Sequence, residues 1–377
     1  MPNANRVSRR DFVKAGAATA AAFTIVNARS VAGTAANSTI EMGLIGAGNR
    51  GVWLSELAHK NTGIRIKAVA DAFPEKLTVA QEKLGVAKER CFHGLDAYLE
   101  VIGTNVDAIA IESPAYFHVA QARAGVDAGK HVYLAKPVAI DVPGCKEIIA
   151  MGRKAAEKKK SFLVDFQTRV TPPFMEAAQR VHAGDLGKVV TGQVYYHAGR
   201  LGIQADPRDK SDAARLKNWF FDKALSGDIL VEQAVHMVDV ANWYLKTHPT
   251  KAFGAGGRKG RTDVGDCWDH YVVTYWYPDV LIDFSCSQFC EGYADLVTRL
   301  YGTEGTVDAH YNGEVNILGR KPYKGGPTKG MYTNGAITNL QTFEKALRED
   351  KPVNNSEESA ISSLSTILGR MAAEKNA

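Results

Sequence analysis

A glycine triplet early in the chain restricts the possible fold more than any other stretch of the sequence. Gly46, Gly48 and Gly51 form the pattern G-x-G-x-x-G between an apolar run, 40–45, and a helix-like segment, 50–59. In such a turn the first glycine permits a tight bend, the second lets the backbone approach a pyrophosphate, and the third lets the helix pack closely on the strand. The helix N-terminus supplies N–H donors to the phosphates. The stretch therefore predicts a dinucleotide-binding unit whose contacts are Gly46, Gly48, Asn49, Arg50 and Gly51.

The residue that ends the second apolar run indicates which dinucleotide is bound. Asp71 follows the run 64–70 and stands 20 residues after Gly51. A carboxylate there accepts hydrogen bonds from both ribose hydroxyls and repels a 2′-phosphate, which favours NAD over NADP. Lys76 is close enough in sequence to keep NADP open as an alternative. A glycine turn in an α/β protein that binds no dinucleotide is the other alternative.

The order of apolar runs predicts an α/β fold with two domains. Up to about residue 167, short and nearly continuous apolar runs alternate with helix-like segments, which is typical of a doubly wound parallel sheet. Later strand-like runs follow one another directly, which indicates an antiparallel sheet. Thr171-Pro172-Pro173 interrupts regular structure, so the expected domains are 38–169 and 170–377. The elements expected after residue 170 are strands at 188–196, 269–277, 281–289 and 296–301, a polar loop at 201–217, and helices at 228–245, 340–349 and 357–374.

The first 36 residues have the pattern of an export signal. Arg9-Arg10 precede a polar and aromatic stretch, an apolar run at 15–26 and a small-residue zone around 31–36. This order is that of a cleavable leader, and the apolar run is too short to span a bilayer. The arginine pair resembles a twin-arginine translocation signal, whose route carries folded proteins. We therefore expect the translocation machinery as a partner and the periplasm as the location, with an amphipathic leader that carries no address as the alternative.

Without that leader the chain is nearly neutral. The formal charge is +5, and residues 1–35 account for +4 of it, which leaves about +1. This balance argues against nucleic-acid binding. The five cysteines are scattered without zinc-ligand spacing, and Cys286 and Cys290 lie too far apart along one strand to form a bridge. We predict no metal site and few or no disulfides, which fits folding in the reducing cytoplasm before export.

Two further strand ends carry polar residues. Ser113-Pro114 follows the apolar run 106–111, with His118 in the next helix, and Lys136-Pro137 follows the run 131–135. In open α/β sheets the ligand binds beyond the carboxyl ends of the strands, so Lys136 is expected to project toward the nicotinamide. An ordinary surface lysine before a proline turn is the alternative.

Together these residues resemble the glucose–fructose oxidoreductase, inositol dehydrogenase and rhizopine catabolism superfamily (Gfo/Idh/MocA). The likeness covers essentially the whole chain after the leader and includes the segment 227–239. It implies a Rossmann domain joined to an α+β domain with an open, mostly antiparallel sheet, and activity on sugars, cyclitols or related polyols. The full set of expected cofactor contacts is Gly46, Gly48, Asn49, Arg50, Gly51, Asp71, Ser113, Pro114, His118, Lys136, Pro137 and Gln167.

Hydride transfer from a secondary alcohol needs a base for the hydroxyl proton and a cation for the developing alkoxide. The resemblance places the cation at Lys136 and the active-site helix at 228–245. Glu232 and His236 are four residues apart and would share one helix face. We expect His236, with a pKa near its ordinary value, to be the general base, and Glu232 to orient it. The family usually has glutamate where this chain has Ala135, and aspartate where it has Glu232.

Several residues are candidates for contact with the substrate: Lys136, Tyr195, His197, Trp219, His236 and Asp239. Aromatic side chains suit the faces of sugars, although core packing explains them equally well. For the helix at 228–245 two other interpretations stay open. His236 could be a core histidine, or Glu232, His236 and Asp239 could ligate a metal from one helix face.

The sequence thus predicts an exported oxidoreductase that transfers a hydride between tightly bound NAD and a sugar or cyclitol hydroxyl. Because soluble NAD is not normally available outside the cytoplasm, a folded-state export route would carry the cofactor out already bound. One alternative is a glycosidase that oxidises a sugar C3 hydroxyl transiently, with no net redox change. The other is a family member that binds ligands without catalysis. We expect no membrane span in the mature chain, and a homodimer or homotetramer as in relatives.

Overall fold

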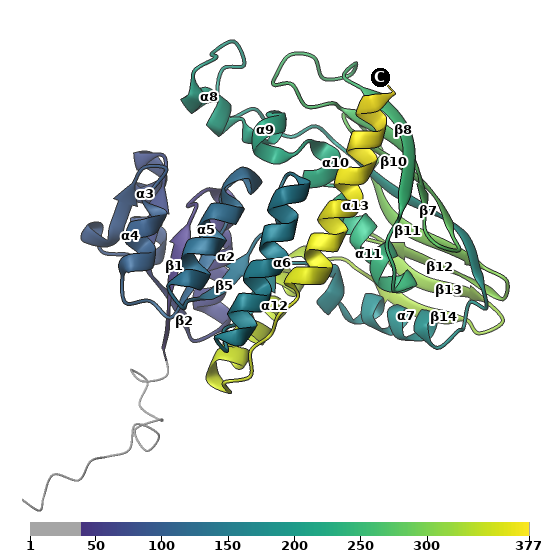
Figure 1. Ribbon diagram of the computed structural model, residues 1–377, viewed down its shortest axis with the longest axis horizontal. Coiled ribbons are helices and arrows are strands. Elements are labelled where there is room, and N and C mark those ends of the chain that lie inside the picture. The colour runs from purple at the N-terminus through teal and green to yellow at the C-terminus, as the bar shows by residue number, and fades with distance from the viewer. Residues whose placement is uncertain (1–38, 377) are drawn as a thin grey trace, which may run out of the picture. The chain divides into compact units, whose positions relative to one another are not determined.

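The computed structural model describes residues 39–376, and the predicted export signal, 1–36, lies outside the described residues. From Ile40 onward the chain forms one compact unit that contains two β-sheets (Figure 1). The first sheet ends before residue 170 and the second begins after it, although the predicted domain limits themselves stay a prediction. None of the helices in residues 39–376 is both long and apolar enough to cross a membrane.

The first sheet has six parallel strands in the order β3-β2-β1-β4-β5-β6, which confirms the predicted doubly wound sheet. Its strand order reverses between β1 and β4, and a ligand of such a sheet binds beyond the carboxyl ends of the strands at that point. The elements of this half are β1 (Ile40–Ile45), α2 (Asn49–Asn61), β2 (Ile64–Asp71), α3 (Pro74–Leu84), β3 (Cys91–His93), α4 (Tyr98–Gly103), β4 (Ala108–Ile111), α5 (His118–Asp127), β5 (His131–Leu134), α6 (Val142–Glu157) and β6 (Phe162–Val164). The sequence did not predict β3, whose three residues are too few to give an apolar run.

The second sheet has eight strands in the order β14-β13-β12-β11-β7-β10-β9-β8. All neighbouring strands are antiparallel except β7 and β10, so the predicted open, mostly antiparallel sheet is confirmed. The strands are β7 (Val189–Ala198), β8 (Lys251–Gly257), β9 (His270–Trp276), β10 (Leu281–Gln288), β11 (Asp295–Gly302), β12 (Gly305–His310), β13 (Glu314–Gly319) and β14 (Tyr323–Pro327). One face packs on helices, and its side chains include the buried Val194, Phe284 and Leu300.

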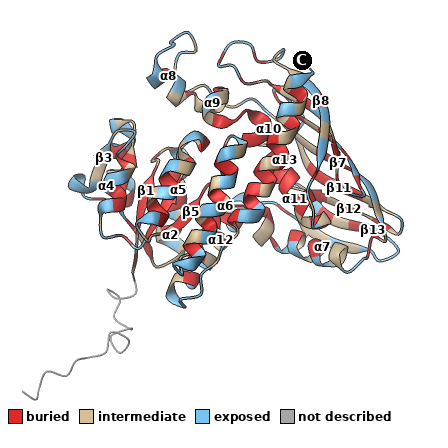
Figure 2. Ribbon diagram, viewed as in Figure 1, coloured by how far each residue is buried: buried red, intermediate tan, exposed pale blue. Residues whose placement is uncertain are grey.

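The second half also contains seven helices among the described residues. They are α7 (Pro172–His182), α8 (Asp212–Lys217), α9 (Lys223–Ser226), α10 (Ile229–Glu232), α11 (Val235–Leu245), α12 (Met331–Arg348) and α13 (Ser356–Lys375). Figure 2 shows that α10 and α11 are almost entirely buried, whereas α8 is largely exposed. The last two helices tie the halves together, because α13 packs on α6 and β8 while Leu340 and Phe343 of α12 join the core beneath β1 and β2.

The predicted continuous helix at 228–245 is wrong. The chain forms α10 and α11 with a break between them, because the Ala234 N–H bonds to the carbonyl of Ile229, five residues back. Such a widened turn inserts one residue into the helical register. The next bonds, from the N–H groups of His236 and Met237 to the carbonyls of Gln233 and Ala234, span only three residues. The helical register is therefore irregular between α10 and α11.

Candidate active site

A cavity of about 460 Å³ lies beyond the carboxyl ends of β1, β2 and β4. This is the position at which a doubly wound sheet binds its ligand. Seven of the twelve predicted cofactor residues line it: Gly46, Gly48, Asn49, Arg50, Asp71, Ser113 and Pro114. The cavity is therefore the candidate nucleotide site.

The three glycines of the first turn have the roles that their spacing predicted. Gly46 adopts a φ of +95°, and a Cβ there would stand 2.6 Å from the backbone nitrogen of Ser113. A Cβ on Gly51 would overlap the carbonyl oxygen of Gly46, so the helix can approach the strand only without a side chain. Gly48 has nothing within 4 Å of its Cβ position, which leaves its backbone open to a ligand in the cavity. The turn thus fits a pyrophosphate against the backbone at Gly48 and the N-terminus of α2.

Asp71 ends β2 and lines the cavity in a fixed orientation. Its Oδ2 accepts a hydrogen bond from the Ala47 N–H at 2.7 Å, and its Oδ1 accepts one from the Phe73 N–H at 2.9 Å. Each carboxylate oxygen keeps a second acceptor position, which suits the two hydroxyls of a ribose. Burial raises the pKa of Asp71 above its ordinary value, against the lowering effect of those backbone donors. The two acceptor oxygens of Asp71 therefore fit the hydroxyls of the adenosine ribose of NAD.

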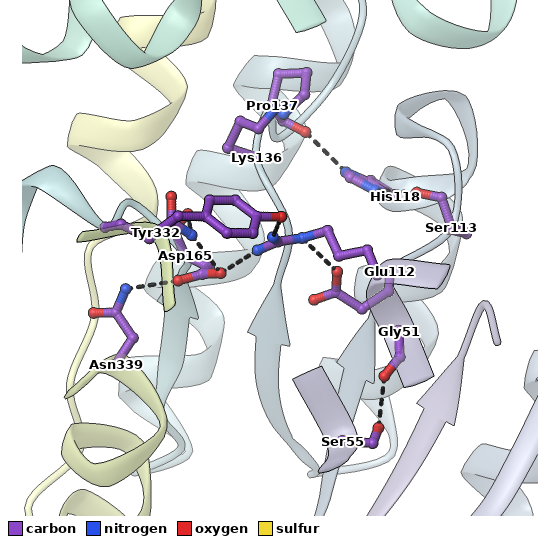
Figure 3. Close-up of polar contacts among 12 residues, drawn as sticks. Gly51, Ser55, Glu112, Ser113, His118, Lys136, Pro137, Asp165, Tyr332 and Asn339 are labelled. Carbon is purple, nitrogen blue, oxygen red and sulfur yellow. Dashed lines mark hydrogen bonds and ion pairs between the residues drawn. The ribbon is translucent and has the colours of Figure 1, made fainter. Parts of the chain in front are cut away.

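Arg50 lines the cavity, but its guanidinium is already engaged on the protein side. Its Nε lies 3.0 Å from Oε2 of Glu112, and its terminal nitrogens bond to Asp165 and to the hydroxyl of Tyr332. Figure 3 shows Glu112, Asp165 and Tyr332 converging from three parts of the chain. Asp165 is held further by Asn339 and Gln167. Arg50 thus lines the cavity, as expected of a cofactor contact, while its guanidinium holds the glycine turn in place.

Glu112 is a site residue that the sequence reasoning missed. It directly follows β4, its carboxylate is fully buried, and Oε1 has no hydrogen-bond partner. Burial raises the pKa of Glu112 to about 7, although the nearby Arg50 lowers it. The available signal was an acidic residue placed directly at the end of a wholly apolar strand.

Lys136 and Glu232 form the second charged group, outside the nucleotide cavity. The Nζ of Lys136 donates to Oε1 of Glu232 at 2.7 Å and to the Glu232 carbonyl oxygen at 2.5 Å. Lys136 follows β5, and Glu232 is the last residue of α10, so the pair joins the two halves of the molecule. The sequence predicted both residues, but it assigned Glu232 to His236 and not to the lysine. The structure shows hydrogen bonds from Glu232 to the lysine and no partner for Nδ1 of His236, so it does not show the predicted pairing of Glu232 with His236.

His236 lies in the first turn of α11 beside Phe166 and Tyr311, with ring-centroid distances of 6.1 and 5.4 Å. Its Nδ1 is buried without a partner, which leaves Nε2 as the nitrogen that can meet a substrate. Burial, together with the positive charges of Lys136 and Arg50, lowers its pKa well below 6.5. The expected ordinary pKa is therefore wrong, and the ring is neutral at physiological pH.

Three predicted substrate residues point elsewhere. Asp239 is fully buried and forms two hydrogen bonds with Arg169, both at 2.9 Å, so it is structural. Tyr195 and His197 lie on the uncovered face of the second sheet, where His197 contacts Ser285 and Ser287 of β10. Strand side chains alternate between faces, so the intervening Tyr196 is the one that faces the helices. Burial and the nearby carboxylate of Glu232 raise the pKa of Tyr196.

Trp219 and the loop before it also differ from the prediction. Trp219, Phe220 and part of the predicted polar loop, from Leu201 to Lys217, line the nucleotide cavity. The cavity lining does not include Lys136, Glu232 or His236. Trp219 therefore lines the nucleotide cavity, and its contact with a substrate stays a prediction.

The remaining predicted cofactor residues support the site from behind. His118 is buried, and its two ring nitrogens contact the carbonyl oxygens of Ser113 and Pro137 at 2.8 Å each, which joins the ends of β4 and β5. Gln167 is buried between Asp165 and Tyr311. His118, Pro137 and Gln167 are not among the residues that line the cavity, so their contact with the cofactor stays a prediction, while their hydrogen bonds fix the backbone around the site. No group of three His, Cys, Asp or Glu within residues 39–376 is arranged to hold a metal ion.

Comparison with protein families gives two matches that together span most of the described chain. Residues 40–166 match the NAD-binding Rossmann fold of the GFO/IDH/MocA oxidoreductase family. Residues 174–308 match the GFO/IDH/MocA C-terminal domain. The two matched ranges meet close to the predicted domain boundary.

Individual proteins agree with these matches. Inositol 2-dehydrogenase of Rhizobium meliloti is 24% identical over 285 residues, which cover 74% of this chain and 78% of the relative. A glycosyl hydrolase family 109 protein of Solibacter usitatus is 31% identical over 158 residues, 38% of this chain and 36% of the relative. Among solved structures, levoglucosan dehydrogenase with NADH and levoglucosan superposes with a TM-score of 0.73 at 20% identity, covering 90% of this chain and 98% of that one. At this identity the superposition shows the shared fold.

Proposed function

The chain belongs to the GFO/IDH/MocA family of NAD-binding oxidoreductases, and we propose that it transfers a hydride between NAD and a secondary hydroxyl of a sugar or cyclitol. The observation that carries this proposal is the Lys136–Glu232 pair. Lysine has three N–H donors, and Glu232 accepts two of them, through Oε1 and its own carbonyl. One donor remains for a substrate hydroxyl.

The chain's own residues divide the chemistry between them. The turn at Gly48, Asp71 and the N-terminus of α2 would hold NAD, which when bound supplies the hydride acceptor or donor. Lys136 polarises the hydroxyl and stabilises the alkoxide as its proton leaves. His236, neutral because of its lowered pKa, accepts that proton at Nε2 and returns it in the reverse reaction. Glu232 fixes the ammonium of Lys136, and the enclosed walls around His236 exclude water.

A retained cofactor is the second element of the proposal, together with export to the periplasm. An exported enzyme meets no external pool of NAD, so the cofactor is recycled between two substrates or within one turnover. The test is to purify the protein after native export, dialyse it extensively, denature it and identify the released nucleotide by mass spectrometry. Stoichiometric NAD or NADH supports retention. NADP contradicts the assignment of Asp71, and an empty site contradicts retention.

The hydride transfer is tested with purified enzyme loaded with NAD, offered inositols, aldoses and anhydrosugars, with NADH formation read at 340 nm. Lys136→Met and His236→Asn should abolish the signal with unchanged NAD binding. Lys154→Ala is the matched control, because Lys154 forms an exposed ion pair with Asp127. Equal activity in Lys136→Met and in Lys154→Ala would overturn the assigned roles.

Transient oxidation in glycoside cleavage is a second candidate. It is favoured by the 31% identity to a glycosyl hydrolase family 109 protein, although that match covers only 38% of this chain. The same base and cation serve both reactions. Release of free sugar from a glycoside without an added electron acceptor, at a rate that exceeds net NADH formation, identifies this second activity.

We further propose that the uncovered face of the second sheet joins copies of the chain into a dimer or tetramer. Phe253, Val272 and Leu318 on that face are each more than half exposed, at 59%, 56% and 60%. Phe253 and Val272 lie on the neighbouring strands β8 and β9, and Leu318 lies on β13 near the other edge of the sheet. Exposed apolar groups on such a face can mark an interaction surface. Light scattering on the mature protein and on Phe253→Glu tests it, since a monomer in both cases contradicts the proposal.

A further inference from the structure

A segment of the second domain forms one wall of the nucleotide cavity. The chain leaves β7 at Ala198, passes through α8, and returns through the 3₁₀ turn Trp219–Phe221 to α9. Along this path Leu201, Gln204, Leu216, Lys217, Trp219 and Phe220 line the same cavity as Gly48 and Asp71. We call residues 201–220 the wall segment.

The wall segment reaches the part of the Rossmann domain that follows β2. Nζ of Lys217 lies 2.8 Å from Oε1 of Glu75 in the first turn of α3, and 4.8 Å from the ring centroid of Phe73. Asp71, Phe73 and Glu75 lie two residues apart along the stretch that joins the end of β2 to the start of α3. In a doubly wound sheet the end of β2 receives the adenosine ribose. Lys217 therefore closes the adenosine side of the cavity.

Hydrogen bonds within the wall segment, and between it and the second domain, hold its conformation. The side chain of Asn218 accepts the N–H of Gln204 at 2.8 Å and donates to the carbonyl of Ala205 at 2.9 Å, which ties the two ends of the loop together. Arg215 bonds to Asp222 at 2.9 Å. The carbonyl of Phe221 accepts N–H bonds from Asp266 and Cys267, which anchor the segment to the second domain.

Its inner surface is aromatic. The rings of Trp219 and Phe220 stack with a centroid distance of 3.8 Å and an interplanar angle of 26°. Both line the cavity. Flat apolar side chains of this kind suit the base and ribose of a nucleoside, and the segment presents them opposite the glycine turn.

We propose that the wall segment is the second half of the adenosine site, so that NAD is bound between the two domains and is released only when the segment moves away from α3. The aromatic pair supplies contact with the adenosine half, and the Lys217–Glu75 pair holds the segment closed. This inference rests on the NAD site but not on the identity of the substrate or on the reaction. It also explains how the cofactor could be retained after export.

The test measures nucleotide binding, independently of turnover. Dissociation of NADH from wild type, Lys217→Ala and Trp219→Ala is followed by stopped-flow fluorescence while excess ADP traps the empty site. Equilibrium affinities for ADP, which has the adenosine half, and for nicotinamide mononucleotide, which lacks it, are measured by calorimetry. Lys210→Ala is the matched control, since Lys210 lies in the same segment, bonds only to the carbonyl of Pro207, and does not line the cavity.

We expect Trp219→Ala to accelerate NADH dissociation about ten-fold and to weaken ADP to a similar extent. Lys217→Ala and Glu75→Gln should each accelerate it about two- to five-fold, because the pair is partly exposed, and the double variant should add nothing to either single one. The affinity for nicotinamide mononucleotide and all properties of Lys210→Ala stay at the wild-type level.

Three outcomes overturn the proposal. They are wild-type ADP affinity in Trp219→Ala, an equal loss for ADP and nicotinamide mononucleotide, and a changed KM for sugar with unchanged nucleotide binding. Trp219→Phe guards against misfolding, because it keeps an aromatic wall and should bind ADP within about two-fold of wild type. ADP binding does not require catalysis, so failure of the proposed reaction leaves this measurement interpretable.

Discussion

Two groups of opposite charges lie at the ends of neighbouring strands of the first sheet, and they are built differently. Beyond β4, one guanidinium, that of Arg50, meets two buried carboxylates, Glu112 and Asp165. Beyond β5, one ammonium, that of Lys136, meets one carboxylate, Glu232. The acids of the first group have no exposed side-chain surface, whereas Lys136 and Glu232 keep 13% and 8%.

The first group supports the fold of the site, and the second can take part in the reaction. Arg50 uses Nε and both terminal nitrogens on Glu112, Asp165 and Tyr332, so the group is directed inward and holds the glycine turn against α12. Lys136 keeps one donor that no described residue accepts. Arg50 keeps 26% of its side chain exposed, but all three of its guanidinium nitrogens are engaged with protein groups, so this group holds a shape. An ammonium that keeps one donor without an acceptor can instead bind a reacting atom.

The largest expected effect comes from removing the shared cation of the first group. Arg50→Met leaves the buried carboxylate of Glu112 without a partner and that of Asp165 with only the neutral amides of Asn339 and Gln167. Breaking a buried ion pair in this way costs about 3–5 kcal/mol. We expect that loss in the free energy of unfolding, measured by urea denaturation, together with weaker NAD binding. The surface variant Arg153→Met, which removes an exposed pair with Glu357, should cost less than about 1 kcal/mol. Equal losses in the two variants would contradict the supporting role.

Removing the cation of the second group should reduce activity more than stability. Lys136→Met removes the donor to the developing alkoxide, and loss of one such donor lowers kcat by about 10²–10³-fold. Glu232 is only slightly exposed, so the variant also leaves one carboxylate less well paired, and we expect a smaller loss of stability than in Arg50→Met. Steady-state kinetics and denaturation on the same preparations check both parts. A variant that is unstable but fully active per folded molecule would reverse the comparison.

The same two groups show how far the sequence could be interpreted. The glycine turn and Asp71 line the cavity, and both belong to a local motif at a strand end. Lys136 follows β5, and its projection toward the nicotinamide stays a prediction. For Glu232 the sequence predicted a partnership with His236, whereas the structure shows hydrogen bonds to Lys136. The irregular turn at Ala234 has no signal in the local pattern.

Long-range contacts account for the other differences. Arg50 lies inside the glycine motif, but its partners Asp165 and Tyr332 come from 115 and 282 residues further along the chain. Trp219 follows a polar loop, and only the fold brings that loop over Asp71. Tyr195 and His197 were assigned to the cleft, while alternation along β7 gives that face to Tyr196. Motifs therefore predicted which strand ends matter, and tertiary structure decided which side chains meet there.

The unpaired oxygen of Glu112 provides a pH test of the first group. Burial raises its pKa from 4.5 to about 7, so the folded protein binds a proton that the unfolded chain has released. Stability therefore falls as pH rises from about 4.5 through 7, by at most about 3 kcal/mol. Arg50, Asp165 and Lys136 are the charged groups that act on it. In Glu112→Gln this decline of stability with pH should vanish. Urea denaturation at pH 5, 6, 7 and 8 measures it. An unchanged slope in the variant would mean that Glu112 stays ionised beside Arg50.

The smallest expected effect is the change that Lys136 causes in the pKa of His236. His236 has a pKa well below 6.5, first through burial and then through the charges of Lys136 and Arg50. A protonated His236 cannot accept the substrate proton, so kcat/KM should fall with acid only below pH 6.5. In Lys136→Met one of the two cations is gone, and we expect the pKa of His236 to rise. An NMR titration of labelled histidine, with the His236→Asn variant for assignment, measures this without turnover. A rise of the His236 pKa in Lys136→Met, with no rise in Lys154→Ala, would show that Lys136 acts on the base. A wild-type pKa near 6.5 would contradict the prediction. It would show that His236 is more solvated than its packing against Phe166 and Tyr311 allows.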